Sequence, residues 1–383
     1  MIRVLHVYKA YLPESVGGIE QVIFQLCEGM DAQGVQSEVL TLSTAPQQFP
    51  NSVGSHRVHR VKQDLYLAST GFSLQLMKRL KSLAAQVDLV HYHFPWPFMD
   101  LLHFAARIGT PYVVSYHLDI VRQKWLLHLY RPLMMRFLGG ATRIIAASPN
   151  YVESSPVLTH FRDKVEVITY GLDYDFYPAS EPDRLQYWKA RLGTDFFLFV
   201  GVLRYYKGLH VLIEAAKNTE FSIVIAGRGP LEKALHNQAR LLGLPNLHFV
   251  GAVEDADKIA MLQLCRAVVL PSHLRSESFG ISLLEAAMLG KAMISCEIGS
   301  GTSYINQHGQ TGIVTPPSDP IALRRALNEL WLKPELAKNM GRKAQQRYWQ
   351  LFTAEQMAGR MTRLYREVLN IHEAEEWSQA PRQ

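Results

Sequence analysis

Residues 267–289 read AVVLPSHLRSESFGISLLEAAML: a short apolar run, a polar loop and a helical pattern. Ala267–Leu270 is typical of a buried strand, and Ser282–Leu289 is typical of the helix that follows it. A strand that leads into a helix through a short loop is the unit from which parallel sheets are built. The stretch therefore predicts an α/β fold whose loop lies at the carboxyl edge of a sheet, where open α/β sheets bind ligands.

The same alternation of apolar runs and helical patterns extends over most of the chain and predicts two doubly wound parallel sheets. In the first half we predict strands at Ile2–Tyr8, Val35–Leu42, Val87–His91, Tyr112–Ser115, Arg143–Ala146 and Val165–Thr169, and helices at Glu20–Gln33, Ser73–Gln86, Asp100–Ile108 and Ile120–Leu138. In the second half we predict strands at Phe196–Gly201, Phe221–Ala226, Leu247–Val250, Ala267–Leu270 and Lys291–Ser295, and helices at Lys207–Lys217, Leu231–Leu242, Ala256–Leu264 and Ser282–Leu289.

A chain of 383 residues is too long for one compact core, because cores stop growing at about 250–300 residues. The segment Gly171–Asp195 carries prolines and acidic residues without a strand pattern, so we place the domain junction there. The first domain then covers residues 1–175 and the second covers 176–353. A final helix at about 354–371 is long enough to return to the first domain, and both sheets can face one cleft.

Charge and composition narrow the function classes. Forty Lys and Arg against 34 Asp and Glu give a net charge of +6, which suits an anionic substrate or membrane surface. No basic run is dense enough for a nucleic-acid arm. The scattered Cys27, Cys265 and Cys296 are typical of a reducing compartment, so we expect a cytoplasmic protein. No apolar window is long enough to span a membrane, and any membrane role is expected to be peripheral.

Two loops are candidate sites for an anion. Gly17 and Gly18 stand directly before a predicted helix, where backbone N–H groups and the helix dipole attract negative charge. Arg204 and Lys207, in GVLRYYKG (residues 201–208), follow a strand and can clamp a diphosphate. The alternative for Gly17 and Gly18 is an ordinary turn, and the alternative for Arg204 and Lys207 is solvated surface charge. The loop with Gly17 and Gly18 lacks G-x-G-x-x-G spacing, which argues against a dehydrogenase-type dinucleotide site.

Carboxylates and a histidine mark the same edge of each sheet. Glu277 and Glu285 can each hold a pair of hydroxyls, the first on a sugar and the second on a ribose. The alternative is a helix cap with one surface acid. Gly227, in AGRGP (residues 226–230), forms another turn at a strand end and is a candidate nucleotide contact. His117 ends a first-domain strand, so its ring is expected to point into the cleft.

A metal site is not expected. His91 and His93 alternate on a strand, but no H-x3-H spacing or acidic partner completes a set of ligands. No D-x-D acid pair stands where Mg²⁺ and a diphosphate would meet. Positive side chains and helix dipoles can neutralise a leaving group in place of a metal ion.

These motifs, together with VGGIE (16–20) and NQHGQTGIVTPPSDP (306–320), resemble the GT-B glycosyltransferases of family 4 over essentially the whole chain. The resemblance implies two Rossmann-like domains and a metal-independent transfer of a sugar, with retention, from a nucleotide diphosphate. It implies the following site: Gly17 and Gly18 by the donor phosphates and the acceptor; Arg204 and Lys207 on the diphosphate; Glu277 on sugar hydroxyls; the backbone of Ser278, Phe279, Gly280 and Ile281 on sugar and phosphate; Gly227 by the nucleotide; Glu285 on the ribose; and His117 near the reacting centre.

The motifs VHYHFPWPFMDLLHF (90–104), DIVRQ (119–123) and GSGTSYINQHGQTG (299–312) further resemble bacterial O-antigen mannosyl- and D-rhamnosyltransferases. That resemblance implies a GDP-mannose or GDP-D-rhamnose donor, no other cofactor, and an undecaprenyl-diphosphate-linked acceptor at the inner face of the cytoplasmic membrane. A transferase that uses a UDP-sugar, a nucleotide-sugar epimerase, a phosphorylase and an inert nucleotide-sugar-binding module are the alternatives.

Two first-domain segments are candidates for contact with that membrane. Ser73–Gln86 is amphipathic, although a helix that simply covers the sheet has the same pattern. The loop His93–Met99 (HFPWPFM) carries Trp96 and Phe98, which suit a membrane interface if they are exposed. We expect the loop to make the contact.

Overall fold

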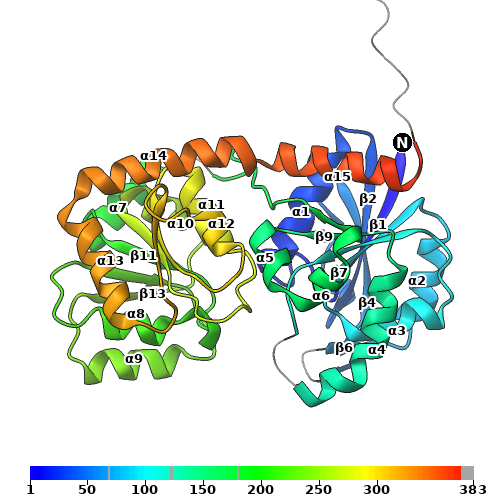
Figure 1. Cartoon of the computed structure of the whole chain (residues 1–383), viewed down its shortest axis with the longest axis horizontal. Helices are drawn as coiled ribbons and strands as arrows, with labels where there is room; N and C mark the ends of the chain where they lie inside the picture. The colour runs from blue at the N-terminus through cyan, green and yellow to red at the C-terminus, as the bar shows by residue number, and fades with distance from the viewer. Residues whose placement is uncertain (68–69, 121–123, 179–180, 372–383) are drawn as a thin grey trace, which may run out of the picture.

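A computed structural model describes residues 1–67, 70–120, 124–178 and 181–371. Two α/β domains lie side by side beneath a pair of long C-terminal helices (Figure 1). The first domain contains an eight-stranded sheet in the order β10-β9-β8-β7-β1-β2-β4-β3, parallel except at β3. Its strands are β1 (Ile2–Val7), β2 (Val35–Ser43), β3 (Ser52–Val53), β4 (His56–Lys62), β7 (Leu89–Phe94), β8 (Tyr112–Tyr116), β9 (Arg143–Ala146) and β10 (Val165–Val167).

Helices cover this sheet, and a separate hairpin lies at its lower edge in Figure 1. The helices are α1 (Gly18–Asp31), α2 (Leu76–Ala84), α3 (Pro97–Ala105), α4 (Lys124–Gly140), α5 (Pro149–Ser154) and α6 (Pro156–His160), and the hairpin pairs β5 (Leu65–Leu67) with β6 (Thr70–Phe72). The predicted start of α4 falls partly on residues 121–123, which lie outside the described residues.

The second domain contains a parallel six-stranded sheet in the order β13-β12-β11-β14-β15-β16. Its strands are β11 (Phe197–Val200), β12 (Ile223–Ala226), β13 (Leu247–Gly251), β14 (Ala267–Leu270), β15 (Ala292–Cys296) and β16 (Gly312–Thr315). Its helices are α7 (Pro182–Leu192), α8 (Leu209–Ala215), α9 (Glu232–Leu241), α10 (Asp255–Leu264), α11 (Ile281–Met288), α12 (Thr302–Ile305), α13 (Pro320–Leu332) and α14 (Pro334–Leu351). The strand order reverses between β11 and β14, which creates a ligand-binding crevice in such sheets.

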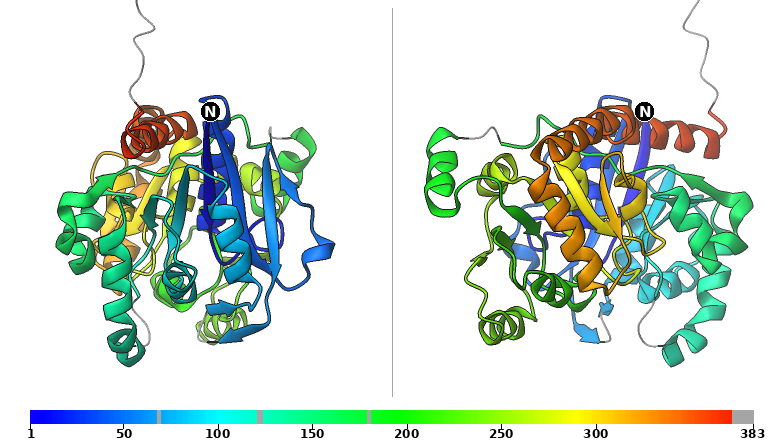
Figure 2. Two further views of the ribbon diagram at one scale, coloured as in Figure 1. Left: turned by 90° about the vertical axis from the view of Figure 1, so that its right-hand side faces the viewer. Right: turned by 60° about the vertical axis from the view of Figure 1, so that its left-hand side comes forward.

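The final helix, α15 (Ala354–Val368), returns to the first domain as predicted. A Cβ built on Gly29 of α1 would lie 2.9 Å from Cβ of Ala358, so these two helices pack in close contact. The Tyr365 hydroxyl lies 2.6 Å from Nδ1 of His91 on β7. Figures 1 and 2 show α14 and α15 passing over both domains. The predicted fold class, two doubly wound α/β domains with a returning C-terminal helix, is confirmed.

The junction contains a helix that the sequence pattern did not predict. In α7, Nε1 of Trp188 donates to the Asp257 carboxylate on α10 at 3.0 Å, and the Trp188 side chain is buried. This helix therefore belongs to the second domain. The prolines of the junction and the charged surface of α7 concealed a short amphipathic pattern, and the boundary at residue 175 stays a prediction.

The prediction for the loop 93–99 is wrong, because its aromatic side chains are not free to meet a membrane. Trp96 is only 1% exposed, and its N–H donates to the Gly71 carbonyl oxygen at 3.2 Å. Phe98 is half-buried against Phe72, with ring centroids 4.8 Å apart. The β5–β6 hairpin, which was not predicted, covers both side chains.

Helix α2 has the alternative role of covering the sheet. Its Leu76, Leu80 and Leu83 side chains are buried, although Met77 remains 43% exposed. Among the described residues, no helix combines the length and the apolar character that a membrane crossing requires.

Candidate functional site

A lysine and a glutamate meet at the crevice of the second domain. Lys207 follows β11, and its Nζ contacts Oε2 of Glu277, which lies in the β14–α11 loop (residues 271–280). Ser272 Oγ donates to the same oxygen at 3.2 Å. Burial lowers the pKa of the Lys207 ammonium, the Glu277 carboxylate raises it, and the net result is a raised pKa. Lys207 therefore remains a cation inside the crevice.

The β14–α11 loop ends in a turn that only glycine adopts easily. Gly280 has φ +98° and precedes the first residue of α11, Ile281. The first N–H groups of a helix have no partners within the helix, and they carry its positive dipole. The Ser278 carbonyl accepts from the Gly301 N–H at 2.8 Å, which anchors the loop. The segment from Ser278 to Ile281 thus lies directly beside Glu277, at a helix end suited to a phosphate or a sugar oxygen.

Glu285, one turn into α11, forms a second charged pair with Lys258. Its Oε1 accepts from Lys258 Nζ at 2.7 Å and from the Tyr177 hydroxyl at 3.0 Å. Lys258 also pairs with Asp255 at 2.7 Å. Sequence reasoning missed Lys258 and Tyr177, because the first lies on another helix and the second lies in the domain junction. Both hold the carboxylate in one orientation.

The first loop of the first domain contacts this region from the opposite side. A Cβ built on Gly18 would lie 3.3 Å from Cγ1 of Ile281, so the two loops approach each other closely at this point. Gly17 is the N-cap of α1. Gly18 therefore lies across the crevice from the loop that carries Glu277.

The other two predicted loop residues lie in the second domain. A Cβ on Gly227 would lie 1.9 Å from the Gly201 carbonyl oxygen, which brings the loops after β12 and β11 together. Arg204 is exposed at the N-cap of the 3-10 turn that holds Lys207. Both residues thus lie at strand ends of the second sheet, as predicted, and their roles toward a ligand stay predictions.

We expected the His117 ring to point into the cleft, but the structure places it in a buried chain of rings. Its side chain is 1% exposed. Its Nε2 lies 2.8 Å from Nδ1 of His93, and its Nδ1 contacts the Tyr170 hydroxyl. His93 Nε2 in turn lies 3.1 Å from Nδ1 of His6. Both ring nitrogens of His117 therefore have protein partners, and its role near the reacting centre stays a prediction.

Burial keeps these imidazoles neutral. Desolvation lowers the pKa of both His6 and His117 to about 3, and the pKa of His93 lies well below its usual value for the same reason. The alternating pattern of His91 and His93, with His6 on the neighbouring strand, was the sequence signal for this cluster. No sequence pattern indicated that Tyr170 completes this cluster.

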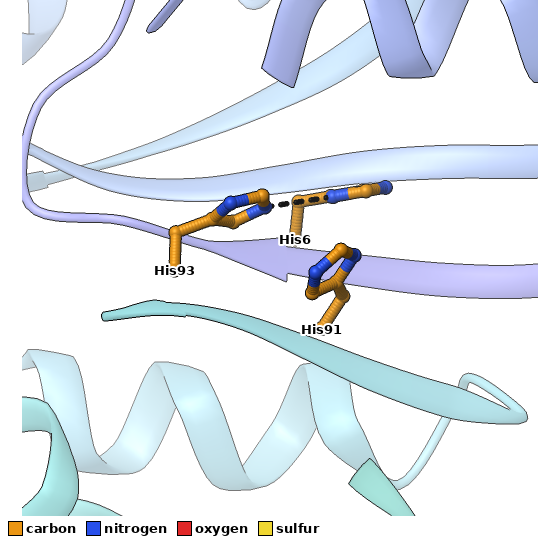
Figure 3. Close-up of side chains that lie close together, drawn as sticks. All are labelled: His6, His91 and His93. Carbon is orange, nitrogen blue, oxygen red and sulfur yellow. Dashed lines mark hydrogen bonds between the residues drawn. The ribbon is translucent and has the colours of Figure 1, made fainter. Parts of the chain in front are cut away.

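His6, His91 and His93 also lie within ligand distance of one another, since their nitrogen atoms are all within 4.8 Å (Figure 3). The His93 ring is stacked on both of the others, however: its centroid lies 4.4 Å from that of His91, with planes inclined by 24°, and 5.4 Å from that of His6, with planes inclined by 23°. Imidazole lone pairs lie in the ring plane, so stacked rings do not converge on one ion. His91 bonds to Tyr365 at 2.6 Å and to Ser115 at 2.7 Å. The arrangement fits a hydrogen-bond network better than a metal centre, and the absence of a metal stays a prediction.

Comparisons with known proteins agree with this arrangement. The model of the glycosyl transferases group 1 matches residues 184–347, and that of glycosyltransferase family 4 matches residues 16–176. The D-rhamnosyltransferase WbpZ of Pseudomonas aeruginosa is 60% identical over 92% of this chain and 93% of its own. The O-antigen chain mannosyltransferase C of Escherichia coli is 47% identical over 96% of this chain and 99% of its own.

A solved structure supports the fold alone. The Anabaena Alr3699/HepE protein in complex with UDP-glucose has a TM-score of 0.76 at 20% identity, and the match covers 96% of this chain and 100% of that one. The likeness therefore extends over both domains of this chain. The chain belongs to the glycosyltransferases of family 4 and has the GT-B fold.

Proposed function

We propose that this protein transfers an α-mannosyl or α-D-rhamnosyl residue from a GDP-sugar to a lipid-diphosphate-linked saccharide in O-antigen biosynthesis. The names of its two similar relatives, a D-rhamnosyltransferase and an O-antigen mannosyltransferase, support the donor class. The contact between Lys207 and Glu277 is the observation that carries the proposal. A cation and a carboxylate at one point of the crevice match a ligand whose diphosphate adjoins a sugar.

In this mechanism the second domain holds the donor. Glu285, oriented by Lys258 and Tyr177, accepts hydrogen bonds from the ribose hydroxyls. Lys207 and Arg204 bind the diphosphate, and Glu277 accepts from hydroxyls of the sugar. Negative charge grows on the diphosphate as the glycosidic bond breaks, so cations fixed beside it stabilise the transition state.

The proposed transfer retains configuration by attack on the same face from which GDP leaves. Glu277 is a hydroxyl-binding group and forms no covalent adduct, so an α-linked GDP-sugar gives an α-linked product. Lys207, Arg204 and the N-terminus of α11 supply positive charge at the leaving group. EDTA is therefore expected to leave the rate unchanged. A β-linked product or a trapped glycosyl–Glu277 adduct would contradict this mechanism.

The proposed acceptor also requires a peripheral visit to the inner face of the cytoplasmic membrane. The exposed side chains of β5, Leu65, Tyr66 and Leu67, are 56–62% exposed and lie on the first domain. Lys78 and Lys81 of α2 are exposed nearby in sequence and can attract anionic lipid. These residues replace the loop 93–99 as the candidate contact.

A donor panel tests the proposed function. The protein is incubated with GDP-mannose, GDP-D-rhamnose or UDP-glucose, together with a synthetic lipid-diphosphate-linked N-acetylglucosamine, and released nucleotide is measured. We expect acceptor-dependent release of GDP from one or both GDP-sugars. Release of UDP alone, or product formation without the lipid diphosphate, would overturn the donor or acceptor assignment respectively.

A further inference from the structure

Arg275 joins the β14–α11 loop to the first domain. Its Nη2 donates to Oδ2 of Asp119 at 2.9 Å, and its Nη1 donates to the Gly299 carbonyl oxygen at 2.9 Å. The guanidinium carbon lies 5.0 Å from the centre of the Tyr151 ring. One planar side chain thus makes two diverging hydrogen bonds and a cation–π contact, a combination that lysine cannot reproduce.

Asp119 is a fixed partner, because its own position is set by three hydrogen bonds. Its Oδ1 accepts from the Tyr116 hydroxyl at 2.9 Å and from Ser155 Oγ at 2.7 Å. Its backbone N–H donates to the Tyr151 hydroxyl at 2.6 Å. The side chains of Arg275 and Asp119 are 26% and 17% exposed, so the ion pair is sheltered from solvent screening. Asp119 stands only two residues after His117.

A second contact joins the same two regions. The Tyr170 hydroxyl contacts Nδ1 of His117, and the Tyr170 ring packs on Phe279 with centroids 4.7 Å apart. Glu277 lies in the chain between Arg275 and Phe279. The loop that carries Glu277 is therefore anchored to the surroundings of His117 on both sides.

We propose that Arg275 and Asp119 are positioning residues, whose ion pair sets the placement of Glu277 relative to His117 across the crevice. Neither residue is among the groups that the proposed mechanism assigns to the donor. The inference rests on the proposed function, because it places a donor sugar between the two loops. In the proposed mechanism the side chains that hold the nucleotide, Lys207, Arg204 and Glu285, all belong to the second domain, whereas transfer needs both domains in register. Loss of the pair therefore lowers kcat and leaves GDP affinity unchanged.

Kinetics of Arg275→Gln, Asp119→Asn and the double variant test the proposal. We expect kcat to fall about tenfold or more in each single variant, since a sheltered hydrogen bond between charged groups is worth about tenfold. The Kd for GDP and the KM for the donor should stay within about twofold of the parent values. The double variant should lose no more than either single one, because residues that act through one another are not additive. Arg275→Lys should be impaired as well.

Asn150→Ala is the matched control. It removes another interdomain hydrogen bond, from Asn150 Nδ2 to Ser303 Oγ at 3.1 Å, that involves neither the β14–α11 loop nor the residues beside His117. We expect its kcat to stay within about twofold of the parent. Parent-like kcat in Arg275→Gln, additive losses in the double variant, or a parallel rise in the Kd for GDP would overturn the proposal.

A structural readout separates this proposal from the proposed function. The native cysteines are buried, so spin labels can be attached to Leu74→Cys in the first domain and Leu332→Cys in the second, which are 90% and 77% exposed as leucines. Distances between the labels report domain placement without any donor. We expect a broader distribution in Arg275→Gln than in the parent or Asn150→Ala. An unchanged distribution would refute the positioning role even if the donor assignment holds.

Discussion

The two domains have opposite chemistry on the two sides of the crevice. The first contains a buried chain of neutral rings, formed by His6, His93, His117 and Tyr170, that carries no net charge. The second contributes the ion pairs of Lys207 with Glu277 and of Lys258 with Glu285. Cations and acids that are already paired can exchange their partners for a charged ligand. The comparison therefore supports the proposal that the second domain holds the nucleotide diphosphate.

The ring chain has a cost that the charged pairs do not share. A buried imidazole whose pKa is lowered must remain neutral, so protons that bind only to the unfolded chain destabilise the fold. The first domain is thus expected to be sensitive to acid, whereas the second is expected to be sensitive to the loss of single charges. The following predictions separate these two behaviours, from the largest effect to the smallest.

Acid should weaken the first domain most. The pKa values of His6 and His117 are about 3 in the fold, against 6.5 for an ordinary histidine. The unfolded chain therefore binds more protons between pH 6.5 and 3, and stability that is complete above pH 6.5 is lost as the pH falls through that window. At pH 5 the loss is about 2 kcal/mol for each ring, or about 4 kcal/mol for both. Hydrogen exchange of β7 amides at pH 7 and pH 5 measures it.

His6→Gln should reduce the loss of stability between pH 7 and pH 5 by about 2 kcal/mol, because one buried imidazole is gone. His160→Gln, at an exposed position on α6, is the control and should keep the parent slope. An equal slope in all three proteins would show that the ring chain is not what acid attacks.

Removing a cation from the second domain should abolish most transfer. Lys207→Ala and Arg204→Ala are each expected to lower kcat by about 10²–10³, or about 3–4 kcal/mol, because each removes a charge fixed beside the leaving diphosphate. GDP release under saturating donor measures the effect. Lys217→Ala, which breaks the surface pair with Glu214 on α8, is the control and should leave kcat unchanged. Near-parental turnover in both crevice variants would refute the diphosphate assignment.

Glu285→Gln should weaken donor binding more than it slows the reaction. It keeps the shape of the side chain but removes a charged acceptor, which is worth about 1.5–3 kcal/mol, or about 10- to 100-fold in the Kd for GDP. Calorimetric titration with GDP gives the Kd. Glu335→Gln, at the exposed pair with Lys338, provides the control. A parental Kd would mean that the ribose lies elsewhere.

The smallest expected effect concerns the membrane. Replacing Leu65, Tyr66 and Leu67 together with serine should reduce pelleting with anionic liposomes several-fold, because peripheral binding strengthens with the apolar area that is buried in the interface. GDP affinity should not change. Leu332→Ser, on the exposed surface of the second domain, is the matched control. Parental pelleting of the triple variant would exclude β5 as the contact.

The sequence predicted the parts of this architecture that depend on neighbouring residues. Short apolar runs and helical patterns predicted most strands of both sheets, although β3, β4 and β16 were not predicted. Glu277, Gly280 and Glu285 could be placed because they follow one strand in one unit. Gly18 was placed in the crevice for the same reason, although its contact with Ile281 was not foreseen.

Contacts between distant segments could not be predicted. The burial of Trp96 depends on a hairpin that begins some thirty residues earlier, and its aromatic loop resembled an exposed one. The partners of His117 lie 24 and 53 residues away in sequence, and Asp119 lies 156 residues from Arg275. Such pairs are determined by strand order and domain placement, which a single sequence does not specify.

A crystal structure of the protein with bound GDP-mannose tests the central claim most directly. The account predicts diphosphate oxygens within hydrogen-bonding distance of Lys207 and Arg204, ribose hydroxyls on Glu285 and mannose hydroxyls on Glu277, with Lys207 and Glu277 no longer paired. A nucleotide bound against the first-domain rings, or a diphosphate remote from Lys207, would contradict it.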